Sequence, residues 1–188
     1  ESKYLPSVTV GLQDFIGTGI YSGEYIVATK HVTPKLTLTG GIGWGRLGSY
    51  NGFSNPLGGL NSSFNTRPTV RQGRLGGVVE SAKWFRGDAA FFGGIAWQAA
   101  PKLTFKAEYS SDAYTRETAR GHFNRKSPYN FGLDYKLSKG INLHANYLYG
   151  SEFGIGLTVK LNPKEPVVNG GREKAPQPMR VRAPENIA

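Results

Sequence analysis

Alternation of apolar with polar or small residues over residues 152–161 is the feature that most constrains the fold of this chain. The apolar positions are Phe153, Ile155, Leu157, Val159 and Leu161, and the others are Glu152, Gly154, Gly156, Thr158 and Lys160. Successive side chains of a β-strand point to opposite faces, so the segment predicts a strand with one apolar face and one polar face. A strand of about ten residues is long enough to cross a bilayer at a tilt.

The same two-residue period recurs along the chain and predicts eight strands. Their expected ranges are 6–14, 22–31, 35–46, 88–99, 102–111, 128–137, 140–150 and 152–162. Short turns near Pro34, Pro101 and Gly140 alternate with longer loops, as in outer-membrane barrels, whose short turns lie on the periplasmic side. We therefore expect an all-β fold, with residues 1–162 forming a transmembrane, antiparallel, up-and-down β-barrel of about eight strands.

Composition supports strands over helices as the membrane-crossing elements. The 188 residues include no Cys, and no apolar run approaches the length of about 18 residues that indicates a spanning helix. The first residues lack the features of a signal peptide, which predicts either a removed targeting segment or an internal piece of a longer chain. After Asn162 the alternation stops and prolines recur, so residues 163–188 are predicted to be a linker or a disordered tail.

Charged residues recur on the expected inner faces of the strands, and a small barrel has an interior filled by side chains. The four cations and four anions are Lys30, Lys106, Lys136, Lys160, Glu24, Glu108, Asp134 and Glu152. Because buried charges need partners, we predict a structural network of ion pairs in the lumen. The alternative is an acid–base pair such as Glu108 with Asp134, but nothing else in the sequence supplies an activated nucleophile.

No catalytic residue, metal site or cofactor is expected. The three His residues show no metal-ligand spacing. Gly43, Gly45 and Gly48 match the spacing of a dinucleotide-binding motif, but a loop and not a helix follows them. Aromatic residues near strand ends instead predict the two interfacial girdles of a membrane barrel. The candidates are Trp44, Trp97, Tyr109, Tyr135 and Tyr149.

Most of the net charge of +10 lies in two long loops. Loop 46–87 carries +5 and loop 113–127 carries +3. The candidate binding residues are Arg67, Arg71, Arg74, Lys83, Arg86, Arg116, Arg120, Arg125 and Lys126. Arginine binds carboxylates and phosphates in a bidentate manner, so the expected partners are lipopolysaccharide phosphates, or an acidic exopolysaccharide and its export machinery. Nucleic acid is not expected, because no recognition fold accompanies the charge.

Several stretches together resemble the YjbH family. They are residues 4–19, 22–30, 43–48, 92–97, 108–114 and 127–135, and the resemblance covers about residues 4–163. It implies a bacterial outer-membrane protein, often a lipoprotein, encoded with exopolysaccharide or capsule genes. Members are typically much longer, which implies that this chain is one barrel-forming segment and that a second segment is a potential partner. The resemblance supplies no catalytic residues.

These observations lead us to expect a non-catalytic barrel in the outer membrane of a Gram-negative bacterium that assists exopolysaccharide secretion or surface assembly. With a filled lumen, the barrel would act through its basic loops and not as a conduit. The alternatives are a structural or adhesive barrel that anchors the envelope, and a barrel enzyme that modifies lipid. A soluble ligand-carrying barrel is a further alternative, but its outer face should be polar.

Overall fold

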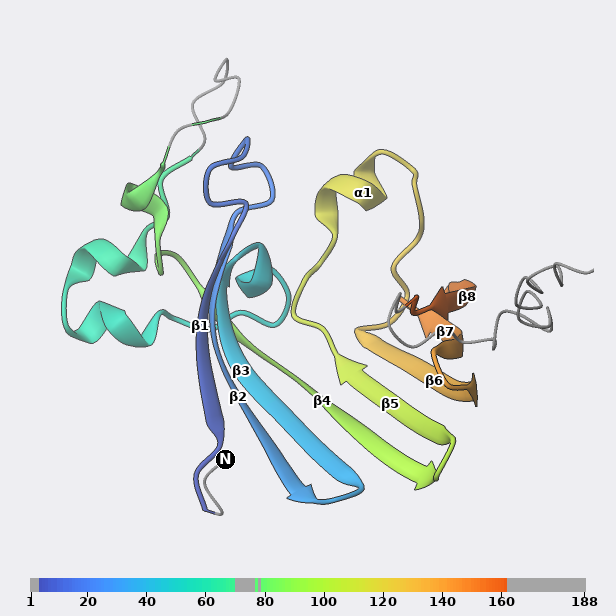
Figure 1. Ribbon diagram of the computed structural model, residues 1–188. Helices are drawn as coiled ribbons and strands as arrows, with labels where there is room; N and C mark the ends of the chain where they lie inside the picture. The colour runs from blue at the N-terminus through green and yellow to red at the C-terminus, as the bar shows by residue number, and fades with distance from the viewer. Residues whose placement is uncertain (1–3, 70–76, 78, 162–188) are drawn as a thin grey trace, which may run out of the picture.

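A computed structural model of the chain describes residues 4–69, 77 and 79–161. These residues form one antiparallel sheet in which each strand pairs with the next along the chain (Figure 1). The strands are β1 (Ser7–Gln13), β2 (Gly23–Thr33), β3 (Leu36–Gly45), β4 (Ala89–Ala100), β5 (Leu103–Tyr109), β6 (Tyr129–Ser138), β7 (Ile141–Leu148) and β8 (Glu152–Val159). The predicted all-β class, the number of strands and their order are confirmed. The predicted tail, 163–188, lies outside the described residues.

The helices of the structure are short and lie in the connections. They are η1 (Arg46–Gly48), η2 (Pro56–Gly59), η3 (Ser62–Asn65), η4 (Ser81–Lys83) and α1 (Thr115–Ala119). None of the helices in the described part of the chain is long and apolar enough to cross a membrane. Tight turns join β2 to β3, β4 to β5 and β6 to β7 where these strands end on one side of the sheet, which we call the turn end. The longer connections gather at the opposite edge, the loop end, at the top of Figure 1.

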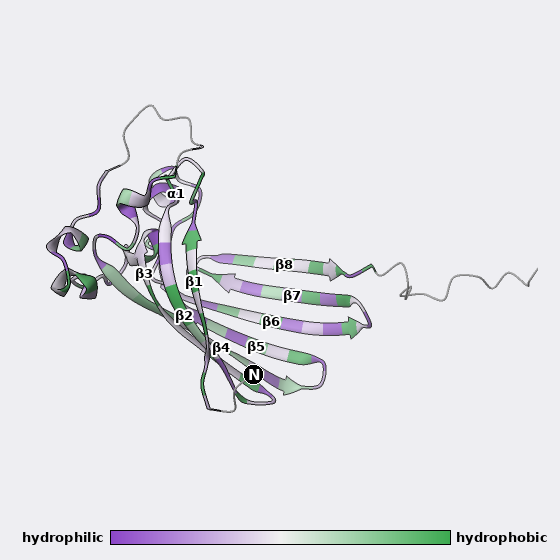
Figure 2. Ribbon diagram, turned by 60° about the vertical axis from the view of Figure 1, so that its left-hand side comes forward, coloured by the Kyte–Doolittle hydropathy of each residue, from purple (hydrophilic) through white to green (hydrophobic). Residues whose placement is uncertain are grey.

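The sheet is open, and the predicted closure into an eight-stranded barrel is wrong. β1 pairs only with β2, and β8 pairs only with β7, so both edge strands are unpaired on one side within the described residues. Figure 2 shows that the sheet is strongly twisted and that β1 and β8 run in clearly different directions. Alternation along a strand reports that the sheet has two different faces, but it carries no information on how many strands close a barrel.

One face of the sheet is apolar and exposed across all eight strands. Directly paired residues share a face, so the register traces rows such as Leu38, Ile95, Ala107, Phe131, Tyr147 and Phe153. Side chains on this apolar face are exposed even though they are large, and Ile155 retains 72% of its accessible surface. In the described residues, the buried hydrophobic side chains are only Trp44, Ala89 and Ala90. The sheet therefore turns its apolar side outward and does not cover it with a second layer.

The opposite, polar face carries hydroxyl, amide and charged side chains among small residues. Its polar members include Thr29, Thr37, Thr39, Thr104, Lys106, Glu108, Asn130, Asp134, Lys136, Asn142, His144, Asn146, Glu152 and Thr158. Glu24 and Lys30 do not belong to it. They pair with Trp44 and Leu38 and lie on the apolar face, so their predicted placement in the lumen is wrong. In β2 both alternate sets contain apolar residues, Ile26 in one and Tyr25 in the other, so periodicity could not separate the faces.

The predicted ion-pair network is reduced to a cluster across β5–β8. Lys106 pairs with Asp134, whose other oxygen lies 2.8 Å from His144 Nδ1. His144 Nε2 lies 2.9 Å from the hydroxyl of Thr158. Glu108 accepts a 3.4 Å hydrogen bond from Asn130. Within the described part of the chain, no ion pair joins the other three predicted members on or beside this face, namely Lys136, Glu152 and Lys160.

Two adjacent glycines of β3 provide a test of how tightly the polar face is packed. A Cβ atom on Gly41 would lie 2.5 Å from Phe92 Cζ and 2.8 Å from the Ile26 carbonyl oxygen, whereas one on Gly40 would meet nothing within 4 Å. We expect Gly41→Ala to lower the free energy of unfolding by about 1–3 kcal/mol, as overpacking commonly does. Gly40→Ala is the matched control and should be neutral or slightly stabilising. Urea unfolding followed by circular dichroism measures both, and equal stability of the two variants would contradict the packing described.

Candidate functional site

The loop end contains a polar cavity of about 350 Å³. It is bounded by parts of the β1–β2 loop, the β3–β4 loop and the β5–β6 loop. The charged residues that line it are Arg46, Arg67, Lys83, Arg116, Asp112 and Glu117. Ligand sites in proteins are usually concave and combine a preformed shape with a few polar groups, so this cavity is the first candidate site.

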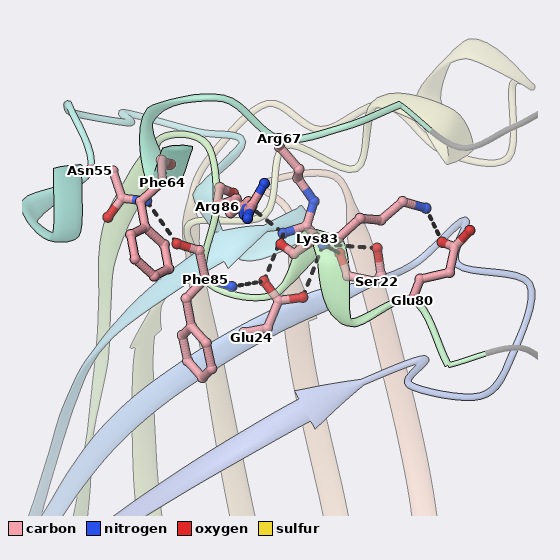
Figure 3. Close-up of polar contacts among 9 residues, drawn as sticks. All are labelled: Ser22, Glu24, Asn55, Phe64, Arg67, Glu80, Lys83, Phe85 and Arg86. Carbon is pink, nitrogen blue, oxygen red and sulfur yellow. Dashed lines mark hydrogen bonds and ion pairs between the residues drawn. The ribbon is translucent and has the colours of Figure 1, made fainter. Parts of the chain in front are cut away.

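Arg67 fastens the long β3–β4 loop to the sheet (Figure 3). Its guanidinium donates bonds of 2.7 and 3.0 Å to the two carboxylate oxygens of Glu24, which is only 2% exposed. It also donates to the Lys83 carbonyl oxygen at 2.9 Å and to the Ser22 hydroxyl at 2.9 Å. The buried charge of Glu24 is therefore compensated by a bidentate partner from a distant part of the sequence.

Asn55 holds the β3–β4 loop together from within. Its side-chain amide donates bonds of 2.9 Å to the Phe64 carbonyl oxygen and 2.8 Å to that of Phe85. The Phe85 ring in turn packs edge-on against Trp44, with 5.2 Å between centroids, and its backbone N–H donates to Glu24 at 3.0 Å. The loop thereby covers Trp44, which is 1% exposed. The result is a folded loop attached to β2 and β3.

Arg46 organises the opposite wall of the cavity. It forms ion pairs with Asp112 and Glu117, the second at 2.6 Å, and its guanidinium lies 4.8 Å from the Tyr21 ring centroid and 5.1 Å from that of Tyr114. Burial opposes its charge, but the hydrogen bonds to Glu117 and Asp112 outweigh burial and raise the pKa of Arg46. The cluster joins the β3–β4 loop to the β5–β6 loop.

The two carboxylates bonded to Arg46 differ in their pKa directions. Burial raises the pKa of Asp112, although hydrogen bonds from the Tyr114 backbone and from Arg46 act in the opposite direction. For Glu117, burial also favours the protonated form, but the hydrogen bond with Arg46 prevails and the pKa is lowered. Glu117 therefore remains the firmly ionised partner of Arg46.

An aromatic cluster supports the β5–β6 loop. Tyr114, Phe123 and Tyr149 pack together, with 4.4 Å between the stacked rings of Phe123 and Tyr149. Burial raises the pKa of the Tyr114 phenol from its usual 10.0 to about 12, and a hydrogen bond with Ser110 offsets only part of this effect. Arg125 lies above Tyr50, with its guanidinium carbon 3.9 Å from the ring centroid.

The nine predicted binding cations differ in their surroundings. Arg67 and Lys83 are engaged in internal ion pairs with Glu24 and Glu80. Arg86 and Arg125 are half-buried above Phe64 and Tyr50, whereas Arg116, Arg120 and Lys126 are exposed. Among the described residues, no partner bonds to the Arg116 side chain, which lines the cavity. Arg71 and Arg74 lie outside the described residues.

The predicted girdle aromatics divide into two groups. Trp97, Tyr109 and Tyr135 lie on the apolar face, Trp97 and Tyr135 toward the turn end and Tyr109 toward the loop end. Trp44 is buried beneath the β3–β4 loop, and Tyr149 belongs to the loop cluster. Their placement in an exposed interfacial girdle is therefore wrong, because loop residues distant in sequence cover both rings.

Three residues that organise the site were not among those predicted from the sequence: Arg46, its partner Asp112, and Asn55, which holds the β3–β4 loop together. Asn55 precedes Pro56 and caps η2 by accepting a hydrogen bond from the Leu57 N–H at 3.0 Å, which is a recognisable local signal. Arg46 and Asp112 are 66 positions apart, and no local pattern connects them.

Comparison with known proteins gives two matches. The model of the family YjbH, described as "Exopolysaccharide biosynthesis protein YbjH", matches residues 1–187. The chain is also 33% identical over 163 residues to the Escherichia coli (strain K12) protein named "Uncharacterized lipoprotein YjbH", covering 86% of this chain and 23% of that relative. The chain thus spans about a quarter of the length of the relative. No solved structure matches the chain.

Replacing Arg67 by Lys should loosen the β3–β4 loop, because an ammonium group cannot reproduce the bidentate contact with Glu24 or reach the same set of acceptors. We expect a loss of about 2 kcal/mol in unfolding free energy, the scale of hydrogen bonds to charged groups, together with faster proteolytic cleavage between residues 46 and 88. Arg116→Lys is the control, since its side chain is exposed. Equal cleavage rates for the two variants would show that Arg67 does not fasten the loop.

Tyr114 should keep its proton at a pH where exposed tyrosines have lost theirs. Its pKa of about 12 in the folded state exceeds the unfolded value of 10.0, so the folded protein holds the proton more tightly. Stability should therefore fall as the pH rises from 10 toward 12, and Tyr114→Phe should weaken this dependence. The difference in phenolate absorbance between wild type and variant during alkaline titration gives the pKa, and a midpoint near 10 would contradict the burial described.

Proposed function

The chain belongs to the YjbH family, and we propose that it forms part of the wall of an outer-membrane β-barrel that assists secretion or surface assembly of an exopolysaccharide. The family description supports the exopolysaccharide context, and the E. coli relative's name as a lipoprotein supports a place in the bacterial envelope. The chain covers 23% of that relative, and we propose that the activity belongs to a longer protein of which this sheet is one part.

The observation that carries this proposal is the exposed apolar face. Phe91, Phe153 and Ile155 are each at least 65% exposed, and comparable side chains continue across the sheet. Burial of each such side chain is worth roughly 1.5–3 kcal/mol, so leaving this face in water would be costly. Lipid contact on one face and water on the other is the arrangement of a transmembrane barrel wall. A soluble barrel would need a polar outer surface.

The unpaired edges favour a barrel wider than eight strands. β1 and β8 each offer unpaired backbone groups on one side, which hydrocarbon cannot satisfy. We propose that strands from the rest of the longer protein pair with these edges. Barrels of roughly 16 or more strands enclose an aqueous channel, in contrast to the filled interior of an eight-stranded one. The polar face described above would line such a channel.

The loop end would then lie outside the membrane and present cations to anionic polymer. Arg116, Arg120 and Lys126 are exposed there, and Arg116 lines the cavity. Acidic exopolysaccharide and lipopolysaccharide phosphates both suit these groups. We assign this chain no catalytic role: the engaged residues at the loop end fasten loops, and the exposed cations serve binding.

Adjacent residues of β8 provide a test of both the membrane location and the function. In the full-length protein, Ile155→Arg places a charge on the apolar face, whereas Gly154→Arg places the same side chain on the polar face, where a Cβ meets nothing within 4 Å. A lipid-facing arginine near the bilayer centre costs about 2–4 kcal/mol. We expect Ile155→Arg, but not Gly154→Arg, to reduce the protein in the outer-membrane fraction and the amount of surface polysaccharide.

Two other outcomes would be informative. If both variants insert normally, the apolar face does not contact lipid and the barrel proposal is wrong. If Ile155→Arg abolishes insertion while surface polysaccharide is unchanged, the protein has a structural role in the envelope and no part in polymer export.

A further inference from the structure

A groove of about 330 Å³ crosses the polar face at the centre of the sheet, over β3, β4 and β5. Gly94 and Ala96 of β4 have little or no side chain, so this part of the face is recessed between larger side chains. The side chains around it are Thr37, Thr39, Phe92, Lys106 and Glu108. The groove is separate from the cavity at the loop end. Most of its lining belongs to the polar face, and Gly93, Ile95 and Ala107, which face the apolar side by register, complete it.

Phe92 gives the groove a fixed apolar wall. Its ring lies nearly perpendicular to that of Tyr25, with 6.3 Å between centroids and 84° between planes. The ring also fills the space above Gly41, where a Cβ would come within 2.5 Å of it. Phe92 is a large apolar residue on a face whose other members are mostly polar or small. A half-buried ring that is held in place and borders a groove is suited to contact the apolar C–H surface of a ligand.

Hydrogen-bonding groups surround that ring. The hydroxyl of Thr39 lies 3.1 Å from that of Thr29, and the hydroxyl of Thr37 lies 2.8 Å from His31 Nδ1. On the opposite side, the Lys106 side chain is 52% exposed and held by Asp134, and Glu108 is exposed. The groove thus combines one aromatic surface, hydroxyl groups, a cation and an anion.

We propose that this groove binds a short saccharide segment and that exopolysaccharide passes along the polar face. A sugar ring has an apolar C–H surface and a rim of hydroxyls that both donate and accept hydrogen bonds, which matches the groups present. The volume lies at the lower end of the range for ligand sites, about 300–1,000 Å³. This inference rests on the proposed function, and it makes the chain part of the polymer's path and not only a docking surface.

Two pairs of matched substitutions in the full-length protein test the groove. Phe92→Leu removes the aromatic surface, and Phe91→Leu makes the same change one residue away on the apolar face. Ala96→Phe fills the groove, and Ala28→Phe places the same side chain on the apolar face. The probe is a set of short, fluorescently labelled oligosaccharides made by partial acid hydrolysis of the polysaccharide that the bacterium secretes, with binding to the detergent-solubilised protein followed by anisotropy.

We expect Phe92→Leu and Ala96→Phe each to weaken binding about tenfold, because the first removes one stacking contact and the second blocks access to it. Both control variants should bind as wild type does. Circular dichroism checks that all four variants fold. Wild-type binding by both groove variants would overturn the inference, as would the absence of any binding to the wild type.

If Arg116→Gln abolishes binding and the groove variants do not weaken it, the polymer contacts the loop end and the groove is not its site. The membrane proposal is tested separately by the Ile155 and Gly154 variants, so failure of one is distinguishable from failure of the other.

Discussion

The structure depends on one constraint: its sheet displays large apolar side chains over one face, and exposing that surface to water carries a large free-energy cost. The face extends from Val8 in β1 to Val159 in β8, and in the described residues it is covered only around Trp44 and Glu24, where the β3–β4 loop lies on it. Because the transfer of apolar surface out of water scales with its area, a contact shared by all eight strands dominates the energetics of the chain. In the barrel wall that we propose, lipid covers this side and the opposite side is free to be polar, and the register keeps the two sets of side chains apart.

The loop end is organised by a second kind of interaction, the pairing of charges that the sheet itself cannot satisfy. Glu24 lies on the apolar face beside Trp44 and would be an isolated buried anion without Arg67. Removing one member of such a pair commonly costs more than the pair contributes as a whole, which explains why a long loop is drawn onto the sheet at this point. The Arg46 cluster has the corresponding role for the β5–β6 loop. Together the two clusters join the three loops that bound the cavity at the loop end.

Periodicity predicted the strands well because the alternation of side chains between two faces is a local signal within each strand. Six of the eight candidate strands had one unmixed apolar set, and all eight formed near their predicted ranges. The two faces of β2 were assigned wrongly, because Tyr25 and Val27 occur in one alternating set and Ile26 occurs in the other. Only the pairing of β2 with β1 and β3 shows which set lies on the apolar face. Closure could not be predicted, since it depends on the twist of the sheet and on the number of strands, neither of which the two-residue period encodes. The contacts of Arg46 and Arg67 were equally inaccessible, because their partners are 66 and 43 positions away in sequence.

The pairing of every strand with its immediate successor has a consequence for how such proteins change over time. No strand is inserted between two others, so each hairpin pairs only with the strand that precedes it and the strand that follows it in the sequence. In the barrel that we propose, duplication of a hairpin, or of the whole eight-stranded unit, would keep the register within each existing hairpin and would add strands to the circumference. Because barrel diameter grows with strand number, such a barrel would change its diameter by gene duplication without redesign of a packed interior.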